Sequence, residues 1–265
     1  MSAAGPKLNR IEGGAKEVGA MFKPSFNAMF NFWSAAAIFF ISMLFAQSAF
    51  AFGIGGYVNF GAGNVEFEEN WDAEDPWARL KNEGDVTFYG FGFLLDTAVA
   101  KNRVFNYRLQ VGYEDAEFDI DTAVNRETGA DISNFVADFK LDVDQIVFDN
   151  TFGFGIVRKE NLRLWFGPQI RVGYISGNGD LTDISGTRLE LDFDGVIFGF
   201  APVVGANFNF SNNLTLGLDL GYRFSLFAGE LEKSGLGQWG GDDFDGNMNT
   251  YFINFALIYR FNDSY

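Results

Sequence analysis

Hydrophobic and polar residues alternate along the segment from Asn213 to Gly229, which reads NLTLGLDLGYRFSLFAG. Leucine and aromatic residues occupy one parity, while glycine, Asp219 and Arg223 fall on the other. An alternation of period two predicts a β-strand. The predicted strand is about twice as long as the usual ~5–6 residues of a globular strand. A strand this long with one apolar face indicates a sheet with longer strands than those of an ordinary soluble protein.

Seven further segments alternate in the same way. The regular ones are residues 53–61, 89–99, 105–113, 162–174 and 251–261. Two longer segments, 135–157 and 189–210, change phase once, near Gln145 and near Asp194–Gly195 respectively. A one-residue slip inside a long strand predicts a β-bulge at each of these points. The sequence therefore predicts eight long strands, two of them bulged.

The connections between these segments alternate in length. Short polar turns are expected at 100–102, 158–161 and 211–213. Longer loops rich in Gly, Asp, Asn and Glu are expected at 64–84, 121–134, 178–187 and 230–247. An even number of strands with short turns at one end and long loops at the other is typical of a bacterial outer-membrane barrel. The predicted fold is all-β: an eight-stranded antiparallel up-and-down transmembrane β-barrel, whose strands all reach the ~9–11 residues needed to cross the hydrocarbon.

The N-terminal region contains the one long apolar run of the chain, from about Ala28 to Phe45, with Lys23 before it. The run closes on the small-residue pattern Ala49–Ala51, which predicts a secretory signal peptide cleaved after Ala51. Residues 1–51 would then be an N-terminal extension with the signal peptide, and residues 52–265 the barrel. A retained transmembrane helix is the alternative, because the run is long enough to cross a bilayer.

The alternation alone does not say which face of each strand points inward. In a membrane barrel the apolar face meets lipid, whereas in a soluble lipocalin-like barrel it surrounds an apolar ligand. The export signal, the strand length, and the mixture of Gly with Arg and Asp on the minority face all favour the membrane barrel. A soluble exported carrier of an apolar ligand stays as an alternative.

Composition narrows the possible functions. The chain has 265 residues, a net charge of −16, 33 Phe, 32 Gly, and neither Cys nor His. The negative charge argues against nucleic acid as a partner, and the lack of Cys excludes disulfides and thiolate metal sites. Because the barrel enzymes of this size that we know depend on histidine as a base, we expect no enzyme and no cofactor.

Charged residues on the minority parity fall near the middle of the predicted barrel. They are Arg108, Asp149, Arg171, Asp219 and Arg223. Eight strands enclose a lumen just wide enough for side chains, and an unpaired buried charge is costly. We therefore expect a lumen charge network that plugs the barrel, with a small gated pore as the alternative.

Two other groups of residues belong to the surface. The expected aromatic girdle at the membrane interfaces comprises Tyr113, Tyr174, Tyr222, Tyr251, Tyr259 and Phe261. The stretch DDFDGN offers Asp242, Asp243 and Asp245 beside a glycine turn as a candidate Ca²⁺ site. It lacks the full EF-hand spacing and a distal Glu, so a solvated acidic surface is the other interpretation, and no metal site is assigned.

In its architecture, the region 52–265 resembles the small bacterial outer-membrane β-barrel proteins, the OmpX-like and OmpA transmembrane-domain-like superfamily, and the C-terminus is the most specific part of the resemblance. Leu257, Tyr259, Phe261 and the terminal Tyr265 continue one apolar face, while Asp263 departs from the pattern. The resemblance implies recognition of this end by the barrel-assembly machinery and a monomer in the outer membrane, in contact with the lipid bilayer and lipopolysaccharide. It also implies a structural, envelope-integrity or surface-interaction role, with a narrow channel for small solutes as the alternative.

Overall fold

The computed structural model describes most of the region that was expected to form the barrel. The described residues are 52–70, 79–97, 104–126, 128–131, 133, 139–182, 188–211, 213–234 and 242–261. The predicted N-terminal extension, signal peptide and cleavage site lie outside the described residues, as does Tyr265. In the part of the chain that the structure describes, no helix is long and apolar enough to cross a membrane.

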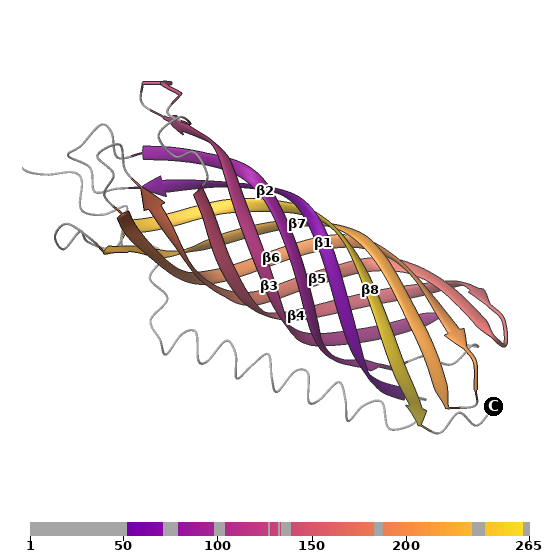
Figure 1. Ribbon diagram of the computed structural model, residues 1–265. Coiled ribbons are helices and arrows are strands. Elements are labelled where there is room, and N and C mark those ends of the chain that lie inside the picture. Colours follow the sequence, from indigo (N-terminus) through magenta and orange to yellow (C-terminus); the bar gives the residue numbers. More distant parts are fainter. Residues whose placement is uncertain are drawn as a thin grey trace, which may run out of the picture. The chain divides into compact units, whose positions relative to one another are not determined.

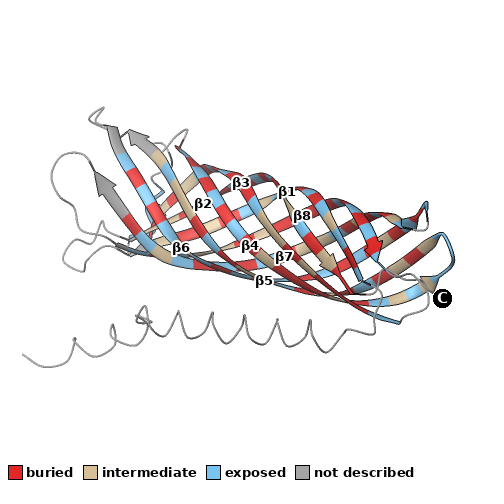
Figure 2. Cartoon of the chain, turned by 90° about the horizontal axis from the view of Figure 1, so that it is seen from below, coloured by how far each residue is buried: buried red, intermediate tan, exposed pale blue. Residues whose placement is uncertain are grey.

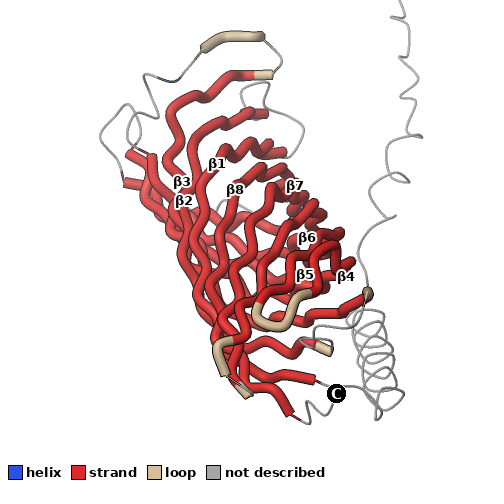
Figure 3. The backbone as a smooth tube through the Cα atoms, turned by 90° about the vertical axis from the view of Figure 1, so that its right-hand side faces the viewer, coloured by secondary structure: helices blue, strands red, loops and turns tan. Residues whose placement is uncertain are grey.

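Eight strands make up the described fold. They are β1 (Phe52–Asn70), β2 (Arg79–Asp96), β3 (Phe105–Asn125), β4 (Phe139–Arg158), β5 (Leu162–Thr182), β6 (Arg188–Asn209), β7 (Leu214–Ser234) and β8 (Asp242–Phe261). Each strand pairs antiparallel with the next, and β8 returns to pair with β1, so the sheet closes into a barrel. The strands wind obliquely around it (Figures 1 and 3). The predicted fold class is confirmed.

The two ends of the barrel differ in their connections. At the turn end, β2–β3, β4–β5 and β6–β7 are joined, β1 begins, and β8 ends. At the loop end, the other four connections are made. Much of what was expected to be long loop is strand, because β7 continues to Ser234 and β8 already begins at Asp242. The prediction of loops over 64–84 and 230–247 was therefore wrong at most of these positions.

The two expected β-bulges are absent from their predicted places, since β4 and β6 pair regularly through Gln145 and through Asp194–Gly195. The register shifts that do occur lie between Glu83 and Gly84, and between Gly155 and Val157. The reason is visible on β4, where every second residue from Phe139 to Thr151 is buried without interruption. The backbone keeps its phase; it is the apolar side chains that change faces.

This change of faces divides the barrel into two halves. On β4, Val143 is inside at 2% exposure, whereas Ile146 is outside at 52%. On β6, Phe193 is inside at 4% and Val196 is outside at 50%. We call the part toward the turn end from these positions the turn-end half, and the remainder the loop-end half. Figure 2 shows the same alternation of buried and exposed residues along the strands of both halves.

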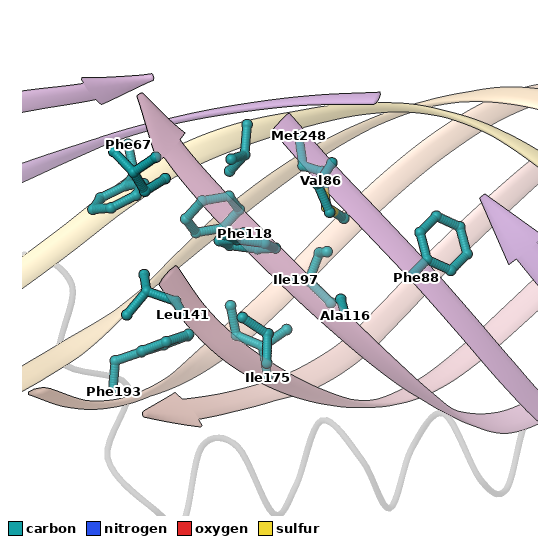
Figure 4. Close-up of a cluster of buried hydrophobic side chains, with 14 of the residues drawn as sticks. Phe67, Val86, Phe88, Ala116, Phe118, Leu141, Ile175, Phe193, Ile197 and Met248 are labelled. Carbon is teal, nitrogen blue, oxygen red and sulfur yellow. The ribbon is translucent and has the colours of Figure 1, made fainter. Parts of the chain in front are cut away.

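The apolar core of the molecule fills the inside of the loop-end half and continues into the turn-end half at Trp165, Val203 and Phe252. All eight strands contribute buried hydrophobic side chains to one cluster that includes Phe118, Phe193, Phe227 and Phe244. Figure 4 shows part of this cluster, with Phe118 among its labelled side chains. The outer face of the same strand segments carries exposed charged residues such as Glu117 and Asp142. The loop-end half is thus built like a soluble barrel, and the expectation of apolar residues outside holds only for the turn-end half.

Candidate functional site

The lumen of the turn-end half contains a charge network that crosses the barrel. Arg108 of β3 lies between two carboxylates: its Nη1 is 2.6 Å from Asp219 Oδ2 on β7, and its Nη2 is 2.8 Å from Asp96 Oδ2 on β2. Nη2 also donates to Asn207 Oδ1 at 3.0 Å. The guanidinium lies over the ring of Trp165, 5.1 Å from its centroid. Because β3 and β7 are on opposite sides of the ring, this arginine ties the two walls together.

A second arginine organises the network nearer the loop end. Arg171 Nη1 contacts Glu114 Oε2 at 2.5 Å, and its Nη2 contacts Asp149 Oδ2 at 2.7 Å. The Arg171 Nε also donates to Asp149 Oδ1 at 2.8 Å. Glu114 accepts a further bond at 2.5 Å from the Asn59 amide of β1. These charge-assisted bonds join β1, β3, β4 and β5, and they neutralise the buried arginine.

Arg223 of β7 has fewer polar contacts than the other two. Its Nη2 donates to Gln169 Oε1 at 3.1 Å, and the nearest carboxylate oxygen, Asp149 Oδ2, is 3.6 Å away. On its other side the guanidinium stacks on Phe252, 4.3 Å from the ring centroid. Arg223 thus lies at the junction of the charged lumen and the apolar core.

The five charged residues singled out from the sequence all lie inside the barrel, each at most 2% exposed. Two partners, Asp96 and Glu114, were not among them. Both continue the inward parity of a recognised strand: Asp96 follows Gly90 and Gly92, and Glu114 follows Gly112. Asp96 lies within the predicted strand 89–99, so its parity alone pointed inward, whereas Glu114 lies one residue beyond the predicted strand 105–113.

A glycine gives the network the space that it needs on β2. A Cβ atom at Gly90 would collide with Asn59 Oδ1 and with the side chain of Glu114. Glu114 accepts hydrogen bonds from both Arg171 and Asn59. A larger residue at position 90 would therefore displace the centre of the network. Gly90 is therefore a packing requirement of the charged lumen.

The outer face of the turn-end half is apolar and exposed. We call it the lipid-facing band; it includes Phe93, Phe198, Leu220, Leu226 and Leu257. Exposed apolar surface of this extent does not fit a protein surrounded by water. A closed barrel leaves no unpaired strand edge, which is the condition for β-strands to cross hydrocarbon. The described strands form a membrane-spanning β-barrel.

Among proteins of known structure, several are similar to this chain at low identity. No family model matches the sequence, and no curated protein matches it. The outer membrane protein OprG from Pseudomonas aeruginosa is similar with a TM-score of 0.45 and 11% identity, over 80% of this chain and 96% of that one. The outer membrane protease OmpT from Escherichia coli gives 0.40 and 11%, over 80% and 97%. A major outer membrane protein from Thermus thermophilus gives 0.41 and 15%, over 78% and 99%. At such identities the likeness concerns the fold alone.

The residues expected to form an aromatic girdle all lie on strands of the barrel. Tyr259 and Phe261 are at the turn end, where Phe261 stacks on Phe52 at 5.0 Å between ring centroids. The rings of Tyr222 and Tyr251, on adjacent strands, are 4.5 Å apart. That these residues anchor the barrel in lipid stays a prediction.

Two tyrosines mark the border of the lipid-facing band on β2–β4. Tyr113 donates from its hydroxyl to Asp144 on the neighbouring strand. Tyr89, which was not expected in the girdle, donates to Asp115 at 2.7 Å. Tyr174 on β5 points outward at the same border and is exposed. A ring in lipid with its hydroxyl on a carboxylate suits the membrane interface.

The stretch considered for Ca²⁺ belongs to β8 and not to a turn. Asp243 and Asp245 point outward in the strand, and Gly246, expected in a turn, is paired with Phe67 and Phe227. Across the described residues, no three His, Cys, Asp or Glu groups converge so as to hold a metal ion. Of the expected C-terminal signal, Leu257, Tyr259 and Phe261 share the outer face of β8.

Proposed function

We propose that this protein is a closed, non-enzymatic barrel that strengthens the cell envelope or binds partners through its loop-end half. The observation that carries this proposal is the filling of the lumen along its length. Ion pairs cross the turn-end half, such as Arg108–Asp219, and aromatic rings cross the loop-end half, such as Phe118–Phe227. A lumen filled in this way leaves no passage of the width that larger barrels provide.

The non-enzymatic part of the proposal rests on the chemistry of the lumen. The chain has no histidine, the commonest general base. The buried carboxylates Asp96, Glu114, Asp149 and Asp219 are all bound to arginine. A carboxylate held in this way is a poor proton acceptor. Incubation of the purified protein with phospholipid, lipid A or a peptide library, followed by mass spectrometry, should give no product; turnover in any of them would contradict the proposal.

Cations are the partners that the outer face of the loop-end half suits best. Asp115 lies directly opposite Asp144 across β3 and β4, and Glu117, which pairs with Lys140 at 2.7 Å, lies opposite Asp142. Like charges in facing positions destabilise a sheet. We therefore propose that divalent cations bridge this face to the phosphates of lipopolysaccharide. Removal of divalent cations with EDTA should lower the melting temperature in lipopolysaccharide bilayers; an unchanged value would count against the bridges.

Insertion and oligomeric state complete the proposal. The outer face of β8, with Leu257, Tyr259 and Phe261, supplies the signal for the barrel-assembly machinery, and the inserted barrel is a monomer. Phe261→Ser should slow insertion into liposomes that contain the purified machinery. Equal insertion rates for this variant and the wild type would show that Phe261 is not part of the assembly signal.

The competing function is a narrow channel for small solutes, and planar bilayers distinguish the two. The wild-type protein should insert, as shown by heat-modifiable gel mobility, and produce no conductance steps. Discrete steps would favour the channel. Protease shaving of intact cells then reports the surface role, because only the loop-end connections should be cut.

A further inference from the structure

Polar and charged side chains fill one half of the lumen and aromatic side chains fill the other, and only the aromatic side chains exclude water. We propose that the aromatic cluster of the loop-end half is the seal of the barrel, and that the charged lumen below it is hydrated. We call this cluster the apolar seal; it consists of Phe67, Phe118, Phe193, Phe227 and Phe244. The inference rests on the proposed closed barrel and assigns closure to named residues, whereas the sequence had assigned it to the charges.

The rings of the apolar seal contact one another across the full width of the barrel. Phe118 of β3 and Phe227 of β7, on opposite walls, have ring centroids 6.2 Å apart. Phe244 of β8 joins this pair through Phe227 at 5.4 Å, and it also reaches Phe193 of β6 at 5.2 Å. Phe67 of β1 contacts Phe244 at 6.1 Å. The contacts therefore join β1, β3, β6, β7 and β8 across the lumen through carbon atoms alone.

The charged lumen, by contrast, contains buried polar atoms that have no hydrogen-bond partner among the described residues. These include Arg223 Nε and Nη1, the hydroxyls of Ser225 and Thr250, both amide atoms of Gln145, and Tyr57 Oη. Arg223 and Thr250 are directly paired across β7 and β8, and Ser225 is the next inward residue on β7. Buried polar groups in folded proteins nearly always have a hydrogen-bond partner. Water is the partner that such a cluster recruits.

The polar cluster ends where the apolar seal begins. On β7 the next inward residue after Ser225 is Phe227, and on β4 the next inward residue after Gln145 toward the loop end is Val143. Water that reaches Gln145 and Ser225 therefore meets carbon. An ion can exchange its hydration shell for the charges and amides of the polar lumen. The apolar layer has no polar groups that could replace the hydration shell of an ion. Hydrophobic constrictions close pores by dewetting for this reason.

The matched positions on β3 and β7 allow a direct test by conductance. Phe118→Ala/Phe227→Ala opens the contact in the apolar seal, and Arg108→Gln/Asp219→Asn removes the charges of the contact below it while keeping polar side chains. Both proteins are inserted into planar bilayers after heat-modifiable mobility has shown that they fold. We expect conductance steps from the ring variant and none from the charge variant. Steps from the charge variant alone would overturn the inference, whereas steps from the wild type would overturn the proposed function instead.

A measurement on the wild-type protein decides the matter if the ring variant does not fold. Water-edited solid-state NMR in lipid bilayers reports which side chains receive magnetisation from water. The side chains of Gln145, Arg223 and Thr250 should receive it rapidly, and the rings of Phe118, Phe227 and Phe244 should not. Rapid transfer to these rings, or equally slow transfer to both groups, would show that the apolar layer is not the seal.

Discussion

The two halves of this barrel use the same two strands in opposite ways. In the turn-end half, β3 and β7 meet across the lumen through Arg108 and Asp219, and in the loop-end half they meet through Phe118 and Phe227. On the outer surface the order is reversed: leucine and phenylalanine cover the turn-end half, and carboxylates cover the loop-end half. The backbone is the same in both halves, so the difference lies in the surroundings. Hydrocarbon requires an apolar exterior and leaves the interior to polar groups, while water requires the opposite.

The largest effect should come from breaking the charge network at Arg171. Arg171→Met leaves Glu114 and Asp149 buried without their arginine, and we expect a loss of about 5 kcal/mol in the free energy of unfolding, the upper end for a broken buried pair. Arg126→Met is the matched control, because Arg126 pairs with Glu68 at the surface with its side chain 45% exposed. It should change stability by at most about 1 kcal/mol. Denaturant titration in micelles measures both, and equal losses would remove the distinction between them.

A smaller loss is expected from the core of the loop-end half. Phe227→Ala removes the ring that contacts both Phe118 and Phe244, and should cost about 3 kcal/mol, the lower end for a buried phenylalanine because the neighbouring rings can close in. Leucine at the same position keeps most of the volume and should restore at least half of the loss. Equilibrium unfolding followed by gel mobility gives both values. An alanine variant as stable as the wild type would show that this half is not held together by its core.

The free-energy cost of an outward-pointing charge should differ between the two halves. Phe198 and Asp192 both point outward on β6, on either side of the position where the exterior changes from polar to apolar. Phe198→Arg places a charge in hydrocarbon and should cost about 2 kcal/mol. Asp192→Arg is the control and should be neutral or slightly stabilising in the same unfolding experiment. A similar cost for both would mean that the lipid extends further toward the loop end than the side chains indicate.

The smallest effect should come from the facing carboxylates of the loop-end half. Asp142→Lys places a cation opposite Glu117, which already pairs with Lys140 at 2.7 Å, and should stabilise the barrel by only about 0.2 kcal/mol, the lower end for a facing pair. Asp142→Asn is the control that removes repulsion without adding attraction, and it should give a smaller gain. Both gains should shrink in high salt, because salt screens exposed charges. A loss of stability in low salt would indicate that Asp142 has a partner of its own.

The sequence was sufficient for the fold and for the inner charges, but it misled at the change of faces. Strand alternation and connection lengths predicted eight strands, and the parity of Arg108 and Asp219 placed them inside. The phase changes near Gln145 and Asp194–Gly195 were interpreted as bulges because alternation records where apolar residues lie, not which medium they face. Glu114 was missed for a related reason: the strand was ended at Tyr113, where the apolar exterior ends.

Lipid exposure along β6 tests the reversal most directly. The chain has no cysteine, so single cysteines placed at the outward positions Asp192, Asp194, Val196, Phe198 and Phe200 can each carry one spin label. In bilayers, labels at 196, 198 and 200 should collide mainly with oxygen, which concentrates in hydrocarbon, and labels at 192 and 194 mainly with a water-soluble nickel complex. One and the same exposure at all five positions would contradict the division of the barrel into two halves.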